Sequence, residues 1–175
     1  AAVNSALPSL VPPRLVNEVA ASSFSERLFA AFTIFAAHAT SARTAAPLKV
    51  SFVVPCYKLA HLLQQCINSI LSQSYTDFEI LVMNDRSPDN TEEVAACYTD
   101  ARVVHVLNEK NLGHLRNYNH GISLSRGEYI WLISADDFLR TPNVLAKYVG
   151  LMDANPRIGY TICSGFAFQD GQEGD

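Results

Sequence analysis

Residues 48–83 read LKVSFVVPCYKLAHLLQQCINSILSQSYTDFEILVM. Two apolar, β-rich segments, Leu48 to Val54 and Phe78 to Met83, flank an amphipathic segment from Leu59 to Ser72. Apolar side chains recur in the middle segment at helical spacing, which predicts a helix with one buried face. The flanking segments are mostly apolar, as expected of strands buried inside a parallel sheet. This order of strand, helix and strand predicts a right-handed crossover unit.

The same alternation continues to the end of the chain. It predicts helices over residues 89–98, 115–125 and 144–153, and strands over residues 103–107, 129–133 and 158–168. Alternating strands and helices favour an α/β sandwich built around a mainly parallel sheet. Residues 48–175 are therefore expected to form one domain, incomplete at its C-terminal end.

The first 47 residues have a different character. Pro8, Pro12 and Pro13 interrupt regular structure, and a capping-box pattern of Ser23 and Glu26 then predicts a helix from Glu26 to His38. Residues 1–47 are expected to be a helical N-terminal extension and linker. The apolar stretch at 28–39 is too short to span a bilayer, which needs about 20 residues.

Composition narrows the class of protein. Of 175 residues, 49% are hydrophobic and 17% charged, and the formal net charge is −4. These values indicate a globular domain, and the negative charge disfavours nucleic acid as a main partner. The four cysteines form no C-x-x-C pair, which favours free thiols in a reducing compartment. The expected location is the cytoplasm, including the inner face of a membrane, although membrane contact is not required.

Polar residues follow each of the first four predicted strands of the main domain. They are Pro55, Cys56 and Tyr57, then Asn84 and Asp85, then Asn108, Lys110 and Asn111, and finally Ser134, Asp136 and Asp137. Ligands of open α/β sheets bind at the carboxyl ends of the strands. Carboxylates gathered there would repel each other unless a cation or a donor-rich ligand lay among them.

The adjacent acids Asp136 and Asp137 are the sharpest polar feature. Mg²⁺ usually takes one or two protein carboxylates together with phosphate oxygens, so this pair could hold an ion against a diphosphate. The alternative is a turn that starts at Asp137. Asp85 could accept a hydrogen bond from a nucleobase N–H or close a local turn, and Tyr57 could stack on a base or end a strand half-buried.

Three common motifs are absent. The chain has no G-x-G-x-x-G after its first apolar strand, no G-x-x-x-x-G-K-[ST] and no G-x-S-x-G. Their absence disfavours a dinucleotide-binding fold, a P-loop NTPase and an α/β-hydrolase.

Taken in order, seven short segments resemble one family. They are VVPCY at 53–57, SILSQSYTDFEI at 69–80, ND at 84–85, NLG at 111–113, NHGI at 119–122, RGEYI at 126–130 and SADD at 134–137. Together they resemble the N-terminal, nucleotide-sugar-binding half of family 2 glycosyltransferases. That family has the GT-A fold, a Rossmann-like α/β sandwich.

The resemblance implies a role for each matching residue. Pro55 and Tyr57 would line the nucleotide pocket, and Asp85 would bind uracil or thymine. Asp136 would contact the ribose and, with Asp137, form a DxD-like element that holds Mn²⁺ or Mg²⁺ against the diphosphate. Arg116 is assigned to phosphate, with a solvated helix face as the alternative.

The implied reaction moves a sugar, with inversion, from a UDP- or dTDP-sugar to an acceptor hydroxyl, with polysaccharides among the acceptors of such families. The catalytic base is expected beyond residue 175, so this chain alone is expected to transfer nothing. The donor sugar and the acceptor stay open.

Four residues depart from the family pattern. Lys58 stands in place of Asn, Arg86 in place of Gly, Tyr118 in place of Arg, and Ser134 in place of the first Asp of D-x-D-D. The loss of one carboxylate keeps an alternative function open, a non-catalytic nucleotide-sugar-binding or interaction module of the same fold. A nucleotidyltransferase is disfavoured because no Gly-rich basic loop follows the first strand.

Overall fold

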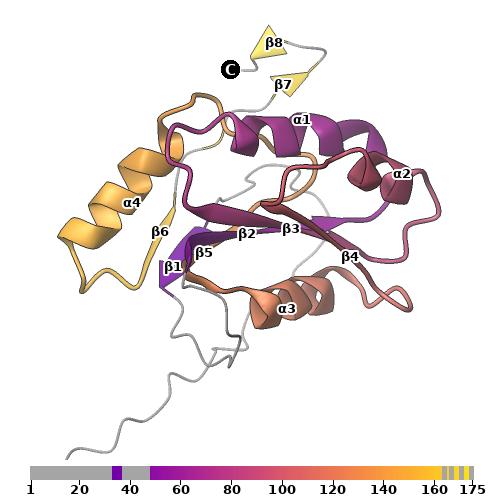
Figure 1. The fold of residues 1–175 in the computed structure, drawn as a ribbon, viewed down its shortest axis with the longest axis horizontal. Helices are drawn as coiled ribbons and strands as arrows, with labels where there is room; N and C mark the ends of the chain where they lie inside the picture. Colours follow the sequence, from indigo (N-terminus) through magenta and orange to yellow (C-terminus); the bar gives the residue numbers. More distant parts are fainter. Residues whose placement is uncertain (1–32, 37–47, 163–164, 166–167, 170–171, 174–175) are drawn as a thin grey trace, which may run out of the picture.

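The structure is a computed structural model that describes residues 33–36, 48–162, 165, 168–169 and 172–173 (Figure 1). A six-stranded sheet has the order β4-β3-β2-β5-β1-β6, and a separate two-stranded hairpin pairs β7 with β8. The strands are β1 Thr33–Ala36, β2 Leu48–Cys56, β3 Phe78–Asn84, β4 Val103–Leu107, β5 Gly127–Leu132, β6 Tyr160–Ile162, β7 Phe168–Gln169 and β8 Gln172–Glu173. The helices are α1 Ala60–Leu71, α2 Thr91–Ala96, α3 His114–Leu124 and α4 Val144–Ala154.

The four strands β4, β3, β2 and β5 are mutually parallel, which confirms the predicted α/β fold with a mainly parallel sheet. In this block Val53 of β2 is in register with Leu81 of β3 on one side and Leu132 of β5 on the other. The carboxyl ends of these strands therefore lie along one edge of the sheet.

Residues 33–36 correct one prediction. They form β1, which pairs antiparallel with both β5 and β6, so the helix predicted from Glu26 to His38 is wrong for these four residues. Thr, Ile and Phe favour extended backbone, and the free edge of β5 supplies the partner. Residues 26–32 and 37–38 lie outside the described part of the chain.

The last predicted strand is also shorter than expected. Among the described residues of 158–168, Tyr160–Ile162 joins the main sheet as β6, whereas Phe168 pairs in the separate β7–β8 sheet. Residues 163–164 and 166–167 lie outside the described residues.

Helices cover both faces of the sheet (Figure 1). Helices α1 and α4 pack on one face over Phe52, Trp131 and their neighbours, and α3 packs on the other face over Val53, Met83 and Ile130. The indole of Trp131 stacks on the ring of Phe52 with centroids 5.2 Å apart. Fully burying one such side chain contributes about 1.5–3 kcal/mol. The sheet is thus a rigid platform for whatever its carboxyl edge holds.

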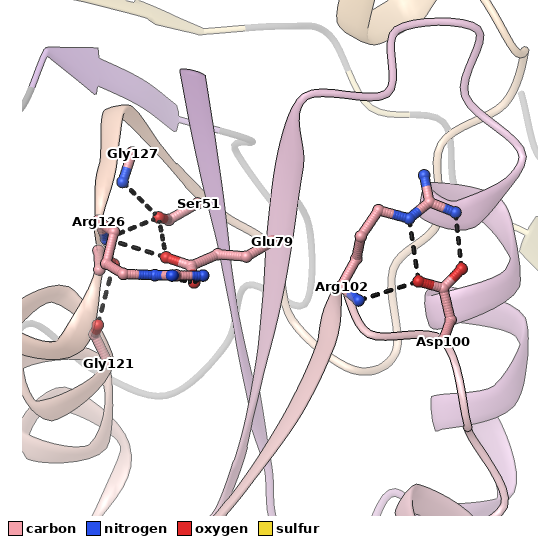
Figure 2. Close-up of polar contacts among 8 residues, drawn as sticks. Ser51, Glu79, Asp100, Arg102, Gly121, Arg126 and Gly127 are labelled. Carbon is pink, nitrogen blue, oxygen red and sulfur yellow. Dashed lines mark hydrogen bonds and ion pairs between the residues drawn. The ribbon is translucent and has the colours of Figure 1, made fainter. Parts of the chain in front are cut away.

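An ion pair between buried Glu79 and partly exposed Arg126 links the α3–β5 connection to the central strands (Figure 2). The guanidinium of Arg126 donates to Glu79 Oε2 through Nε at 2.8 Å and Nη2 at 2.6 Å. Ser51 Oγ donates to Glu79 Oε1 and accepts from the Gly127 amide. A Cβ at position 127 would run into the backbone of Ser51, so only glycine allows this close approach.

At the opposite end of the strands, Asp89 ties two connections together. Its carboxylate accepts from the backbone N–H of Ala60, at the start of α1, and from the hydroxyls of Ser87 and Thr91. Ser87 Oγ in turn accepts from the Lys58 amide. Burial would raise the pKa of Asp89, but these hydrogen bonds outweigh it and lower the pKa to about 2. The β2–α1 and β3–α2 connections are therefore held as one unit.

Candidate functional site

A cavity of about 380 Å³ opens at the carboxyl edge of the parallel strands. It is lined by the last residues of β2, by residues that follow β2, β3, β4 and β5, and by the start of α3: Pro55, Cys56, Tyr57, Leu59, Asp85, Asn111, Gly113, His114, Asn117 and Ser134. This volume falls in the range of small-molecule sites, and the position is the one that α/β sheets use for ligands.

Of the predicted nucleotide-binding residues, Pro55, Tyr57 and Asp85 line this cavity. Pro55 is buried within β2, whereas Tyr57 is 42% exposed just beyond the strand. The Lys58 ammonium lies 5.4 Å from the centroid of the Tyr57 ring. Tyr57 is therefore an exposed ring at the cavity, available for stacking, rather than a half-buried strand end.

Asp85 is a buried carboxylate with donors on both oxygens. Oδ1 accepts from Leu112 N at 2.7 Å and Asn108 Nδ2 at 2.9 Å, and Oδ2 accepts from Gly113 N at 2.9 Å. Its exposed fraction is 2%. The β4–α3 connection thus folds over Asp85, and Oδ2, with one donor here, keeps the greater capacity to accept another hydrogen bond.

Two backbone positions at this edge carry strain. Lys58 has φ 59° and Arg86 has φ 55°, a left-handed conformation that costs non-glycine residues of order 1 kcal/mol or more. They follow the adjacent strands β2 and β3, and both side chains are exposed. The turn after Asp85 therefore keeps a glycine-like backbone although arginine occupies it.

The acids Asp136 and Asp137 follow β5, two residues past Ser134. Asp136 is exposed and Asp137 half-buried, and the Asp137 amide donates to Ser134 O at 3.0 Å. Burial, followed by the charge of Asp136, raises the pKa of Asp137 to about 6. The four ion pairs found between described residues involve neither acid. Two adjacent carboxylates, one of them half-buried, suit a divalent cation.

Asp85 and the acidic pair lie on the same edge of the sheet. Asp85 follows β3 and Ser134 follows β5, the two neighbours of β2, and both line the cavity. Two strand spacings place these connections about 10 Å apart. In the part of the chain that the structure describes, no group of three or more His, Cys, Asp or Glu side chains could hold a metal ion on its own. Phosphate oxygens would have to complete the coordination of any ion at Asp136 and Asp137.

Helix α3 contributes three further features. Arg116 is exposed and is not among the lining residues, so its phosphate role stays a prediction. The ring of Tyr118 meets that of His114 edge-on, with centroids 4.8 Å apart. Burial, followed by the charges of Asp137 and Asp136, raises the pKa of Tyr118. A neutral phenol rather than a guanidinium therefore lies near the acidic pair.

Sequence reasoning missed Asn117 and His120. Asn117 is 1% exposed and hydrogen-bonded to Asn108, and His120 contacts the other end of the Asn108 amide. A usable signal is the spacing of Asn117 and Gly121, one helical turn apart. A Cβ at position 121 would clash with Val53 and Met83, so α3 lies close to the sheet there and Asn117 must be buried.

Comparison with solved structures gives the class of the fold. The sheet matches that of S. aureus TarS solved with UDP-GlcNAc, at a TM-score of 0.59 and 23% identity, over 62% of this chain and 32% of that one. It also matches a mannosyltransferase of Pyrobaculum calidifontis solved with GDP-Man and Mn²⁺, at a TM-score of 0.59 and 23% identity, over 68% and 37%. The fold is therefore that of GT-A glycosyltransferases.

Sequence comparison then gives the family. The family model described as glycosyl transferase family 2 matches residues 51–173, and the chain belongs to this family. It is 34% identical over 114 residues to glycosyltransferase GlyG of Streptococcus pneumoniae, covering 63% of this chain and 38% of that protein. It is 35% identical over 91 residues to chondroitin synthase of Pasteurella multocida, covering 51% and 9%. The chain thus spans less than two fifths of the length of each of these relatives.

Proposed function

We propose that the chain is the donor-binding part of a glycosyltransferase that moves a sugar, with inversion, from a UDP- or dTDP-sugar to an acceptor hydroxyl. The observation that carries the proposal is the cavity at the carboxyl edge, where Tyr57, Asp85 and Ser134 converge and the acids Asp136 and Asp137 follow. Family membership gives this cavity its chemical context. Two solved structures of like fold were determined with nucleotide sugars, which supports the same ligand class here.

Within this proposal each residue has a physical task. The exposed Tyr57 ring stacks on the base, and the spare accepting capacity of Asp85 Oδ2 receives a base N–H. Asp136 and Asp137 hold Mn²⁺ or Mg²⁺, which stabilises the negative charge that develops on the leaving diphosphate. The proposed location is cytoplasmic. No helix in the described segments is long and apolar enough to cross a bilayer.

Titration calorimetry of the chain with UDP and dTDP, with and without Mn²⁺, tests the proposal. We expect binding that Mn²⁺ strengthens, and we expect Asp137→Ala to abolish that strengthening because one of two carboxylate ligands is lost. Asp77→Ala is the matched control, since Asp77 is exposed and precedes β3 at the far edge of the sheet. Absence of nucleotide binding under both conditions would rule the proposal out.

The alternative function is a non-catalytic nucleotide-sugar-binding module. It is favoured by Ser134, which lines the cavity where the family pattern has a carboxylate. Both functions predict nucleotide binding, so turnover has to separate them. We expect residues 1–175 alone to transfer no sugar, and a longer form that includes the acceptor side to release UDP from a UDP-sugar. Persistent lack of turnover by such a form would favour the binding module.

A further inference from the structure

A chain of buried side-chain hydrogen bonds lies behind Asp85. Asn117 Nδ2 donates to the carbonyl of Met83 at 2.9 Å, and Asn117 Oδ1 accepts from Asn108 Nδ2 at 2.8 Å. The same Asn108 Nδ2 donates to Asp85 Oδ1 at 2.9 Å. On its other side, Asn108 Oδ1 lies 2.9 Å from His120 Nδ1. Asn108 is 3% exposed and Asn117 1% exposed, so water cannot readily replace these partners.

The donor and acceptor in each of these hydrogen bonds are fixed by the Met83 carbonyl and the Asp85 carboxylate, which can only accept. The Met83 carbonyl only accepts, so Asn117 must face it with Nδ2 and must turn Oδ1 toward Asn108. Asp85 Oδ1 already accepts a backbone N–H, and it too needs a donor from Asn108. Asn108 therefore donates one Nδ2 hydrogen to Asn117 and the other to Asp85. Its Oδ1 is left as an acceptor, so the proton of this contact must sit on His120 Nδ1.

We propose that His120, held with its proton on Nδ1, is a positioning residue for Asp85 in nucleotide binding. His120 anchors the Asn108 amide, Asn108 fixes Asp85 Oδ1, and Asp85 Oδ2 is thereby held for the ligand. Without the imidazole donor, buried Asn108 Oδ1 would lack its partner and the amide could rotate away from Asp85. This proposal rests on the proposed function, because it acts through nucleotide binding by Asp85. His120 itself is not among the residues that line the cavity.

The tautomer can be measured without any ligand. Long-range ¹H–¹⁵N correlation spectra of the chain at pH 8 should show a protonated Nδ1 and an unprotonated Nε2 for His120. The assignment can be made by comparison with His120→Phe, which lacks these signals. A proton found on Nε2 instead would overturn the proposal, since the direction of the whole hydrogen-bond chain would then be wrong.

Calorimetry on three variants tests the positioning role. His120→Phe keeps a ring but loses the donor, and should weaken UDP binding about three- to tenfold, the value of one hydrogen bond. His120→Asn places a side-chain N–H near the position of the imidazole Nδ1 and should recover most of the affinity. His61→Phe is the control, because His61 is exposed on α1. This variant should bind UDP as tightly as the unaltered chain does.

The outcomes separate the two proposals. Unchanged affinity in His120→Phe, or an equal loss in His120→Phe and His120→Asn, overturns the positioning role, because the donor would then not matter. Denaturation midpoints of each variant show whether an affinity loss merely follows unfolding, and the rescue by His120→Asn has to hold at matched folded fractions. If the unaltered chain binds no nucleotide, the proposed function fails and the positioning role with it, whereas an Nδ1 proton would show that the hydrogen-bond chain itself is real.

Discussion

At the scale of single residues, Asp137 bears an unfavourable charge. It is half-buried beside Asp136 and takes part in none of the four ion pairs found between described residues. Burial and the neighbouring acid together raise its pKa to about 6. Ionised Asp137 therefore lowers the free energy of unfolding, and a cation bound there would relieve the repulsion between the two carboxylates.

The raised pKa predicts a specific pH dependence. Between the ordinary value of 3.8 and about 6, folded Asp137 holds its proton more tightly than unfolded Asp137 does. The free energy of unfolding therefore falls as the pH rises through this window, and the penalty persists at higher pH. Asp137→Asn should remove the penalty, so the variant should gain stability relative to the unaltered chain at pH 7.5 but not at pH 3.5.

Urea denaturation without metal, at both pH values, measures this effect. Asp77→Asn is the control for the loss of one acidic side chain, since Asp77 is exposed and lies at the far edge of the sheet. A constant difference between Asp137→Asn and the unaltered chain across the window would contradict the prediction.

Some residues of the candidate site could be predicted from the sequence and others could not. Pro55, Tyr57 and Asp85, which the sequence placed together at strand ends, line one cavity because their strands are adjacent and parallel. It could not reveal the donors that Asp85 meets, because Leu112 and Gly113 reach it through the β4–α3 connection. The path of such a connection depends on tertiary contacts that periodicity does not encode.

At the scale of elements, amphipathic helices were predicted well and residues 33–36 were not. Each end of helix α1 is within one residue of the predicted range 59–72, because the apolar residues that form its buried face recur at helical spacing within that segment. Strand β1 depends on β5 and β6, whose residues lie far along the chain. A local helix signal therefore gave the wrong answer where long-range pairing decides.

Two ion pairs in Figure 2 offer a matched comparison between elements. Glu79–Arg126 joins β3 to the α3–β5 connection, and the Glu79 side chain is 3% exposed. Asp100–Arg102 lies within one connection, and both side chains are about a third exposed. Glu79→Gln should lower the free energy of unfolding by about 2–4 kcal/mol, because it leaves Arg126 and Ser51 without a charged partner.

Asp100→Asn should cost less than about 1 kcal/mol, as is usual for exposed pairs. Thermal or urea unfolding of both variants gives the two values. Equal losses would show that the Glu79–Arg126 pair does not fasten the α3 layer to the sheet.

At the scale of the whole molecule, alternation of strands and helices predicted parallel pairing but not strand order. The order β4-β3-β2-β5-β1-β6 depends on which edge each crossover reaches. It also depends on an N-terminal segment that enters between β5 and β6. Neither is visible in the hydrophobic pattern of any one segment.

Burial of Cys66 gives a global measure of folding. Cys66 is 0% exposed between α1 and the sheet, and burial raises the pKa of its thiol, whereas Cys97 is exposed. Because the thiolate is the reactive form, Cys66 should react only when the sandwich opens. The test is timed labelling with a thiol reagent, read by peptide mass spectrometry. Cys97 should be modified at once, whereas Cys66 should be modified only at the rate at which added urea unfolds the chain. Comparable labelling rates in native buffer would contradict this.

The residues that line the cavity come from segments at the ends of four separate strands, so the cavity should form late in folding. Contacts between segments so distant along the chain form late, because loop-closure entropy is lost before they are gained. No early folding intermediate can present Tyr57, Asp85 and Ser134 together. A ligand that fits this cavity should therefore slow unfolding without accelerating folding, and the melting temperature should keep rising with the logarithm of ligand concentration above Kd.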